Sequence, residues 1–272
     1  MRLMREVRCF PDDNVETAHM LNTWAGPVSN AKLATFWIIR AFVDGPVDEQ
    51  TGYLCDIKRL DAILHGVVVR RLLEQETGCR NEASAAATAL LESFPLAAER
   101  CSAPGSLQSL ELKVSPFMSF TVYRGDRRMV RLTRSFEFCA SHRLYCRDFS
   151  DQENRRIFGK CSNPHGHGHN YVLEVTVSGT PDELSGTVVD PPHLDRVVKE
   201  RVIDPFDHKN LNVECAEFSS LNPSVENIAR VIWNRLEGAL ERCRLTSVRV
   251  WETPKTYAEY TGRQEGQTRS VL

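Results

Sequence analysis

Three histidines alternate within the segment 161–171, at His165, His167 and His169. In an extended chain the residues at positions i and i+2 point to the same face, so two neighbouring imidazoles of this set can share a metal ion. Four hydrophobic residues keep the parity of His167 and His169, so the ligand face should continue into a buried apolar face. These residues are Tyr171, Leu173, Val175 and Val177.

A shared metal needs a further ligand, and His142 is the candidate because it ends a strand-like run from 130 to 141. Three neutral imidazoles leave one tetrahedral position open, which is typical of a catalytic rather than a structural zinc site. The pattern His-x-His also occurs in exposed glycine-rich turns and in adventitious metal sites. The histidines alone leave that alternative open.

Four more residues have types suited to proton transfer or ligand binding. Cys161 follows Lys160 in a loop, and a thiol near a cation or zinc has a lowered pKa and can act as a base. Asp207 and His208 are adjacent, and a carboxylate that orients an imidazole can form part of a proton relay. Glu252 ends an apolar strand, where one carboxylate can accept two parallel N–H bonds from the 2-amino-pyrimidinone edge of a pterin or guanine. Taken singly, a free cysteine is more often a small buried residue, and an Asp-His pair more often lies in a surface loop.

The composition bounds the class of protein. The chain has 272 residues, 42% hydrophobic and 26% charged, which is ordinary for a soluble globular protein of one large or two smaller domains. A net charge of −2 gives no electrostatic basis for binding nucleic acid or an anionic membrane. The sequence shows no membrane-spanning apolar run or signal-peptide core, and its nine cysteines form no Cys-x-x-Cys pair. We therefore expect reduced thiols and a cytoplasmic location.

The chain contains an internal repeat. Residues 45–61 align with residues 179–195 at an offset of 134 positions, and seven of the 17 aligned pairs are identical, where chance would give about one. A second match aligns residues 107–116 with residues 245–254 at an offset of 138, which places an insertion or deletion in the helical region between. Such a repeat indicates a duplicated structural unit.

Each half has the pattern of two strands, two helices and two strands. In the first half we expect strands near 3–10, 33–43, 107–114 and 117–123, and helices at 57–75 and 82–92. In the second half we expect strands near 129–141, 168–178, 245–252 and 256–260, and helices at 193–202 and 224–242. The sequence thus predicts an α+β fold of two units, 1–125 and 126–272.

The two halves differ in chemistry. At the offset of 134, His167 and His169 align with Leu33 and Thr35, so the first half lacks the histidine pair. Residues 1–125 are therefore predicted to be a non-catalytic scaffold, while 126–272 carry the site.

The second half resembles the 6-pyruvoyl-tetrahydropterin synthase family over about residues 129–262, whereas the first half resembles it only as a scaffold. The matching segments, which occur in the family's order, are Ala140–Leu144, Phe158–Pro164, Gly166–Tyr171, Asp207–Leu211, Ser224–Asn227 and Trp251–Thr253. The resemblance implies two tandem T-fold units, each a four-stranded antiparallel sheet with two antiparallel helices. It also implies a zinc-dependent lyase of tetrahydrobiopterin biosynthesis, which converts 7,8-dihydroneopterin triphosphate to 6-pyruvoyl-tetrahydropterin with release of triphosphate.

The resemblance also implies a role for each site residue. Zinc would be held by His142, His167 and His169. Cys161 would remove a proton from the substrate, and Asp207 with His208 would complete a relay. Glu252 would anchor the pterin ring, with support from Glu226.

His165 leaves an ambiguity inside the family. It makes Cys161-x-x-x-His165-Gly-His167 match the pattern of 6-carboxy-tetrahydropterin synthase, which uses the same substrate, releases acetaldehyde and serves 7-deazaguanine (queuosine) biosynthesis. We prefer His167 and His169 as ligands because Asn170 and Tyr171 then fall in family position. A third alternative, from another class, is a non-catalytic zinc- and pterin-binding assembly protein.

The resemblance further implies assembly into sheet barrels, with the cysteine and the Asp-His pair of one site contributed by different subunits. Because only the second half carries Cys161, Asp207 and His208, we expect a homo-oligomer. We predict three chains that form a pseudo-hexamer, with the catalytic halves grouped in one barrel and the non-catalytic halves in the other.

Overall fold

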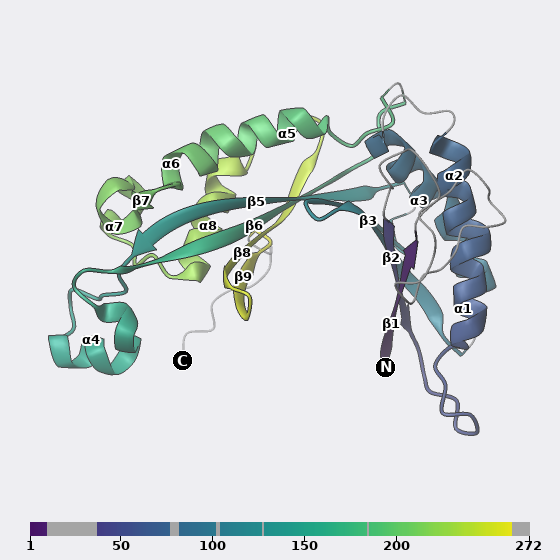
Figure 1. Cartoon of the computed structure of the whole chain (residues 1–272), viewed down its shortest axis with the longest axis horizontal. Helices are drawn as coiled ribbons and strands as arrows, with labels where there is room; N and C mark the ends of the chain where they lie inside the picture. The colour runs from purple at the N-terminus through teal and green to yellow at the C-terminus, as the bar shows by residue number, and fades with distance from the viewer. Residues whose placement is uncertain (10–36, 77–81, 102–103, 127, 184, 263–272) are drawn as a thin grey trace, which may run out of the picture. The chain divides into compact units, whose positions relative to one another are not determined.

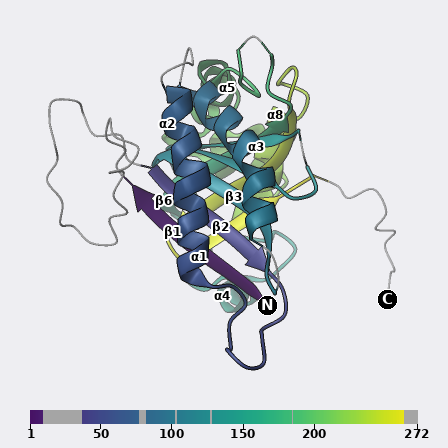
Figure 2. The same cartoon turned by 90° about the vertical axis from the view of Figure 1, so that its right-hand side faces the viewer.

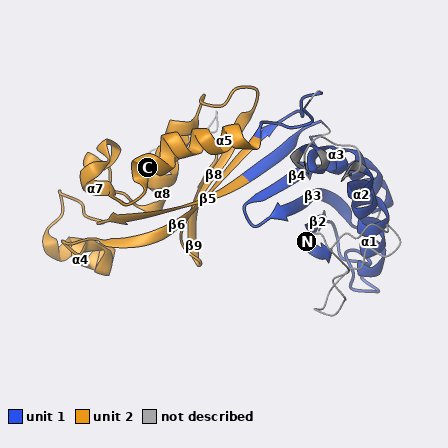
Figure 3. Ribbon diagram, turned by 45° about the horizontal axis from the view of Figure 1, so that its top comes forward, with its two compact units in different colours: residues 1–133, 178–190 blue, residues 134–177, 191–272 orange. Residues whose placement is uncertain are grey.

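The computed structural model describes residues 1–9, 37–76, 82–101, 104–126, 128–183 and 185–262 (Figure 1). The chain divides into two compact units (Figure 3). Unit 1 comprises residues 1–133 and 178–190, and unit 2 comprises residues 134–177 and 191–272.

Unit 1 contains a sheet with the strand order β1-β2-β3-β4, and each neighbouring pair in this series is antiparallel. Its helices lie over one face of that sheet (Figure 2). The strands are β1 (Arg2–Cys9), β2 (Trp37–Asp44), β3 (Ser106–Ser115) and β4 (Met118–Tyr123). The helices are α1 (Ile57–Ile63), α2 (Arg70–Glu76), which follows α1 through the π-helical segment Leu64–Val69, and α3 (Glu82–Arg100).

Unit 2 has the strand order β5-β6-β8-β9, with β8 and β9 antiparallel and the short β7 running parallel to β5. The strands are β5 (Val130–His142), β6 (His167–Gly179), β7 (Lys209–Asn210), β8 (Arg244–Thr253) and β9 (Thr256–Tyr260). The helices are α4 (Asp151–Phe158), α5 (Pro191–Val198), α6 (Asp204–Phe206), α7 (Leu211–Glu214) and α8 (Val225–Leu236). A π-helical segment, Lys199–Ile203, joins α5 to α6, and 3₁₀ turns occupy Gly159–Ser162 and Ala216–Ser219.

The hydrophobic alternation explains which face of each sheet is covered. In β2 the residues Trp37, Ile39, Ala41 and Val43 are buried, and their neighbours are only partly so. In β6 the side chains of Tyr171, Leu173, Val175 and Val177 are buried, as their parity predicts. The mixed helix-and-strand class with an antiparallel sheet is confirmed.

Three predicted helix boundaries were wrong. The helix expected to end at Glu92 continues to Arg100, although it contains Pro95. The helix expected to reach Arg242 ends at Leu236, because Glu237 leaves helical geometry and Gly238 takes a φ of 72°. The helix expected at 193–202 begins at Pro191 and continues through the π-helical segment into α6. Residue 10 and residues 33–36 of two predicted strands lie outside the described residues.

Equivalent positions of the repeat make the same contacts. The Asp48 N–H donates to the Tyr53 carbonyl at 2.8 Å, and the Asp182 N–H donates to the Thr187 carbonyl at 3.0 Å. In each turn the glycine four residues after the aspartate donates back to the aspartate carbonyl, with a φ of 71° at Gly52. These shared turns are what a duplicated unit is expected to keep, and the duplication itself stays a prediction.

An ion pair between a strand and a helix also recurs, between β1 and α1 in unit 1 and between β5 and α5 in unit 2. Arg5 forms two bonds to the Asp61 carboxylate, at 2.7 and 2.8 Å. Arg134 forms two bonds to Asp195, at 2.8 and 2.6 Å. Asp61 and Asp195 are an aligned pair of the repeat, so aligned aspartates anchor α1 and α5 to their sheets.

Candidate active site

Two strands of unit 2 bring the three predicted ligands together. His142 ends β5, and His167 and His169 begin β6, with the turn through Gly166 before them. Gly166 has a φ of 70°, and a side chain there would lie 2.9 Å from the His142 carbonyl oxygen. Only glycine allows this close approach without strain, so the turn fixes the position of β6 beside His142.

His142 is held in one tautomer by the backbone. Its ring is fully buried, and its Nδ1 lies 2.7 Å from the carbonyl oxygen of Pro223, the residue before the cap of α8. A carbonyl only accepts, so Nδ1 carries the proton and Nε2 keeps its lone pair. The pKa of His142 is lowered to about 4, mainly by burial; the Pro223 carbonyl opposes this shift and the neighbouring imidazoles add to it. The ring is therefore neutral at neutral pH, as a metal ligand must be.

The nitrogen atoms of the three rings have the spacing of metal ligands. His142 Nε2 lies 3.2 Å from His167 Nε2, and one nitrogen from each of the three histidines lies within 4.8 Å of the others. Two nitrogens bonded to one tetrahedral zinc at about 2.0–2.1 Å would be about 3.3–3.4 Å apart. His169 Nε2 is buried and makes no hydrogen bond. A buried nitrogen without a hydrogen bond is costly, and a cation would satisfy it, so these residues fit a divalent metal.

Glu252 lies closer to the histidines than the sequence indicated. Its Oε1 is 3.5 Å from His142 Nε2 and 3.7 Å from His169 Nε2. Burial lowers the pKa of His169, and Glu252 opposes this shift. The Glu252 side chain is 21% exposed, so it can face both the histidines and a ligand from solvent.

Tyr171 connects the histidines to the core of unit 2. Its hydroxyl lies 3.4 Å from His142 Nδ1, and its ring stacks on Phe138 with centroids 4.9 Å apart. Burial raises the pKa of Tyr171, with smaller contributions from Glu252 and Cys161.

Cys161 lies in the 3₁₀ turn after α4, partly exposed, and its carbonyl accepts from the Leu144 N–H at 2.9 Å.

Asp207 and His208 form a hydrogen-bonded pair beside β5. His208 Nδ1 lies 2.8 Å from Asp207 Oδ2, while Asp207 Oδ1 accepts from the Cys139 N–H at 2.8 Å. The His208 N–H donates to the Cys139 carbonyl at 2.6 Å, and these contacts hold His208 at a φ of 57°, which is rare for a non-glycine residue. The hydrogen bond from Cys139, with that from His208, lowers the pKa of Asp207, so the carboxylate is ionised and can orient the imidazole.

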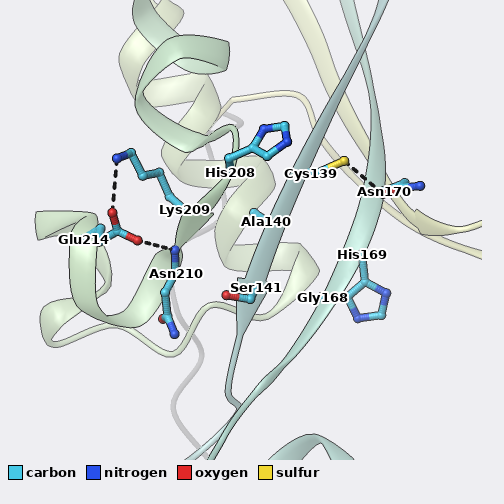
Figure 4. Close-up of a pocket in the computed structure, with 10 residues that line it drawn as sticks. All are labelled: Cys139, Ala140, Ser141, Gly168, His169, Asn170, His208, Lys209, Asn210 and Glu214. Atoms are coloured by element: carbon cyan, nitrogen blue, oxygen red, sulfur yellow. Dashed lines mark hydrogen bonds and ion pairs between the residues drawn. The ribbon is translucent and has the colours of Figure 1, made fainter.

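The His208 side chain is 80% exposed. Together with His169 and Cys139 it lines a cavity of about 390 Å³, in which the imidazoles of His208 and His169 point in different directions (Figure 4). Among the described residues, the only side chain paired with the His208 ring is Asp207. Within one chain, the relay pair is thus presented to solvent rather than to the three histidines.

The remaining predicted residues lie at the periphery. Glu226 is exposed in the first turn of α8, the helix that begins two residues after Pro223. His165 is exposed and lies outside the histidine group, with its N–H donating to the Asn163 side chain at 3.1 Å. The sequence reasoning missed Pro223 and Tyr171 as groups that orient His142. Tyr171 had a signal, since it shares the parity of His167 and His169, whereas a backbone carbonyl such as that of Pro223 has none.

None of the helices in the described part of the chain combines the length and apolarity that crossing a bilayer requires. The fold and the site define a protein that can hold one divalent metal with three imidazoles at the end of a sheet and present a carboxylate beside it.

Comparisons with known proteins identify the family of this chain. The family model described as 6-pyruvoyl tetrahydropterin synthase matches residues 131–263. Human 6-pyruvoyl tetrahydrobiopterin synthase is 41% identical over 138 residues, covering 51% of this chain and 95% of that protein. The 6-carboxy-5,6,7,8-tetrahydropterin synthase of Haemophilus influenzae is 30% identical over 152 residues, covering 48% and 99%. A solved structure of Caenorhabditis elegans 6-pyruvoyl tetrahydropterin synthase has a TM-score of 0.48 at 37% identity, covering 50% of this chain and 96% of that one. The chain belongs to the 6-pyruvoyl tetrahydropterin synthase family.

Proposed function

We propose that unit 2 is a zinc-dependent lyase that converts 7,8-dihydroneopterin triphosphate to 6-pyruvoyl-tetrahydropterin and releases triphosphate. The observation that carries the proposal is the group formed by His142, His167 and His169, with a buried nitrogen that makes no hydrogen bond and a carboxylate beside it. The higher identity to the human 6-pyruvoyl enzyme than to the 6-carboxy enzyme favours the pyruvoyl product.

The three histidines would hold Zn²⁺ through their ring nitrogens. When bound, zinc supplies a Lewis acid that polarises the hydroxyl groups of the substrate side chain. The fixed tautomer of His142 keeps its Nε2 available, because Nδ1–H is donated to the Pro223 carbonyl. Tyr171 packs behind His142 and keeps water away from the buried side of the ring.

The remaining polar residues have roles in binding and proton transfer. We assign Cys161 as the base that removes a proton from a side-chain carbon of the substrate. Asp207 orients His208 and stabilises its charged form, so that the outer nitrogen of this exposed ring can give and take a proton. Glu252 accepts two N–H bonds from the 2-amino-pyrimidinone edge of the pterin, and Glu226 supports the same pocket.

The exposure of His208 supports a homo-oligomer in which the relay of one chain completes the site of another. We propose three chains in a pseudo-hexamer. Mixing inactive Cys161→Ala chains with inactive His208→Ala chains should restore partial activity, because one of the mixed sites then carries both intact groups. No recovery after demonstrated subunit exchange, or full activity of a monomer in light scattering, would refute the intermolecular relay.

Product analysis tests the proposed reaction. The zinc-loaded protein is incubated with 7,8-dihydroneopterin triphosphate, and the pterin product is identified by mass. Formation of 6-pyruvoyl-tetrahydropterin with triphosphate supports the proposal, and release of acetaldehyde would assign the 6-carboxy reaction instead. Binding of zinc and pterin without turnover would favour a non-catalytic binding protein.

A further inference from the structure

Unit 1 contains a cavity with mainly apolar walls, to which Glu99 and Asp126 also contribute, and which the proposed reaction does not use. It has a volume of about 340 Å³ and is lined by the C-terminal half of α3 and the end of β4. Figure 3 shows α3 and β4 in unit 1. Its walls include Leu91, Phe94 and Ala98 from α3, and Val122, Tyr123 and Arg124 from β4 and the turn after it. Pockets that bind small molecules begin at about 300 Å³, so the cavity can enclose a small ligand.

The equivalent place in unit 2 is filled by an aromatic ring. There the Trp233 indole of α8 packs against Tyr260 of β9, with ring centroids 5.6 Å apart, and only 6% of Trp233 is exposed. A side chain at Gly262 would lie 2.7 Å from the indole, so the ring occupies the space above the strand end. At the offset of 138 that aligns the last two strands, Tyr260 and Gly262 correspond to Val122 and Arg124, which line the cavity of unit 1.

Unit 1 therefore has a cavity at the place where unit 2 has the Trp233 indole. Two aromatic side chains, Phe94 and Tyr123, line the space, and the Arg131 guanidinium lies over one face of the Tyr123 ring, 4.2 Å from its centroid. Phe94 and the uncovered part of Tyr123 can contact a planar molecule. Tyr123 is 36% exposed, so the cavity has a mouth that reaches solvent.

Pro95 adds a polar feature to the cavity. It lies inside α3 and lines the space together with Leu91, four residues before it. Proline has no N–H, so the Leu91 carbonyl lacks the donor that an α-helix normally supplies at position i+4. A ligand that carries an N–H group on an aromatic ring can donate to this carbonyl while its apolar body fills the cavity.

We propose that the cavity between α3 and β4 binds a planar aromatic heterocycle of indole size that carries a ring N–H. The place of Trp233 in unit 2 sets the size and shape of the ligand, and the Leu91 carbonyl sets the requirement for a donor. The site belongs to unit 1, which carries none of the residues assigned to the lyase reaction.

Calorimetric titration of the full-length protein with indole tests the proposal. One indole should bind per chain. Ala98→Trp places an indole in the cavity and should weaken binding at least tenfold. Leu96→Trp is the matched control, because Leu96 is on the same helix, is 41% exposed and does not line the cavity, so binding should be unchanged. Benzothiophene, which has the same shape without the N–H, should bind roughly 2- to 10-fold more weakly than indole, the range for one lost hydrogen bond.

Several results would overturn the proposal. Failure of the wild-type chain to bind indole excludes the site. Equal binding by Ala98→Trp and wild type places the ligand elsewhere, and equal binding of benzothiophene and indole removes the role of the Leu91 carbonyl. If Ala98→Trp does not give a native circular dichroism spectrum, Ala98→Leu, which fills less of the cavity, must still weaken binding, and unchanged affinity in that variant also refutes the site.

Discussion

Replacing Asp207 with asparagine separates the orientation of His208 from the stability of unit 2. The Asp207 carboxylate accepts a bond from the Cys139 N–H at 2.8 Å and pairs with His208 Nδ1 at 2.8 Å. In Asp207→Asn one of the two acceptor positions becomes an NH₂ donor. This donor faces either the backbone N–H of Cys139 or the ring N–H of His208. The imidazole then loses the partner that fixes its tautomer and stabilises its charged form.

The expected size of the effect follows from these contacts. A hydrogen bond to a charged group contributes about 1.5–3 kcal/mol when it is shielded from water. Because the Asp207 side chain is 35% exposed, solvent screening should reduce the loss of unfolding free energy to about 1–2 kcal/mol. Loss of an oriented acid–base group costs roughly 10²- to 10⁴-fold in rate, so kcat should fall much more than stability does.

Asp195→Asn is the matched control. Asp195 also accepts two charge-assisted bonds within unit 2, from Arg134, and its side chain is 37% exposed. Urea unfolding should show a similar loss of stability in both variants, while triphosphate release should fall only in Asp207→Asn. Equal activity of the two variants would refute the role of Asp207 in orienting His208.

Three further outcomes are expected. Zinc analysis after dialysis should find one zinc per wild-type chain and none in His142→Ala or His169→Ala. The zinc content of His165→Ala should be nearly full. Loss of zinc in His165→Ala with retention in His169→Ala would show that the wrong histidines were assigned as ligands. Gly166→Ala should destabilise the protein by roughly 1–3 kcal/mol in chemical unfolding, since its φ of 70° and the 2.9 Å approach to the His142 carbonyl both disfavour a side chain. Gly168→Ala, whose nearest contact would be 3.4 Å away, should cost less, and equal losses would remove the argument for Gly166. Cys161→Ala should keep zinc and lose turnover, and full activity of that variant would exclude Cys161 as the base.

The strands and the histidine group were predictable because their signals are local. Alternation of apolar residues places Tyr171 and Val175 on the buried face of β6, and the same parity places His167 and His169 together. His142 could be assigned because it ends the preceding strand. These predictions needed only the two-residue period of a strand and the ligand preferences of a metal.

The parts that were missed depend on tertiary contacts or on turn geometry. The capping box of Ser150 and Glu153 starts α4, and this signature was present in the sequence but not used. The C-terminus of α8 is set by Gly238, whose position inside an otherwise helical pattern was overlooked. The approach of Glu252 to the histidines has no sequence signal, because β8 must first be placed beside β6.

The position of Glu252 also leads to the most direct test of the account. Its Oε1 lies 3.5 Å from His142 Nε2. Two ligand atoms of one tetrahedral zinc are separated by about 3.3–3.4 Å. The same geometry would therefore suit a closed structural site with Glu252 as the fourth ligand. A catalytic site instead keeps that position open and uses Glu252 to bind the pterin.

The decisive measurement is zinc affinity and pterin binding in Glu252→Gln, by competition with a zinc chelator and by calorimetric titration with a pterin. If the site is open and catalytic, Glu252→Gln binds zinc nearly as tightly as wild type and loses pterin binding and turnover. A loss of zinc affinity of 100-fold or more, with the pterin still bound when zinc is in excess, would contradict the open catalytic site.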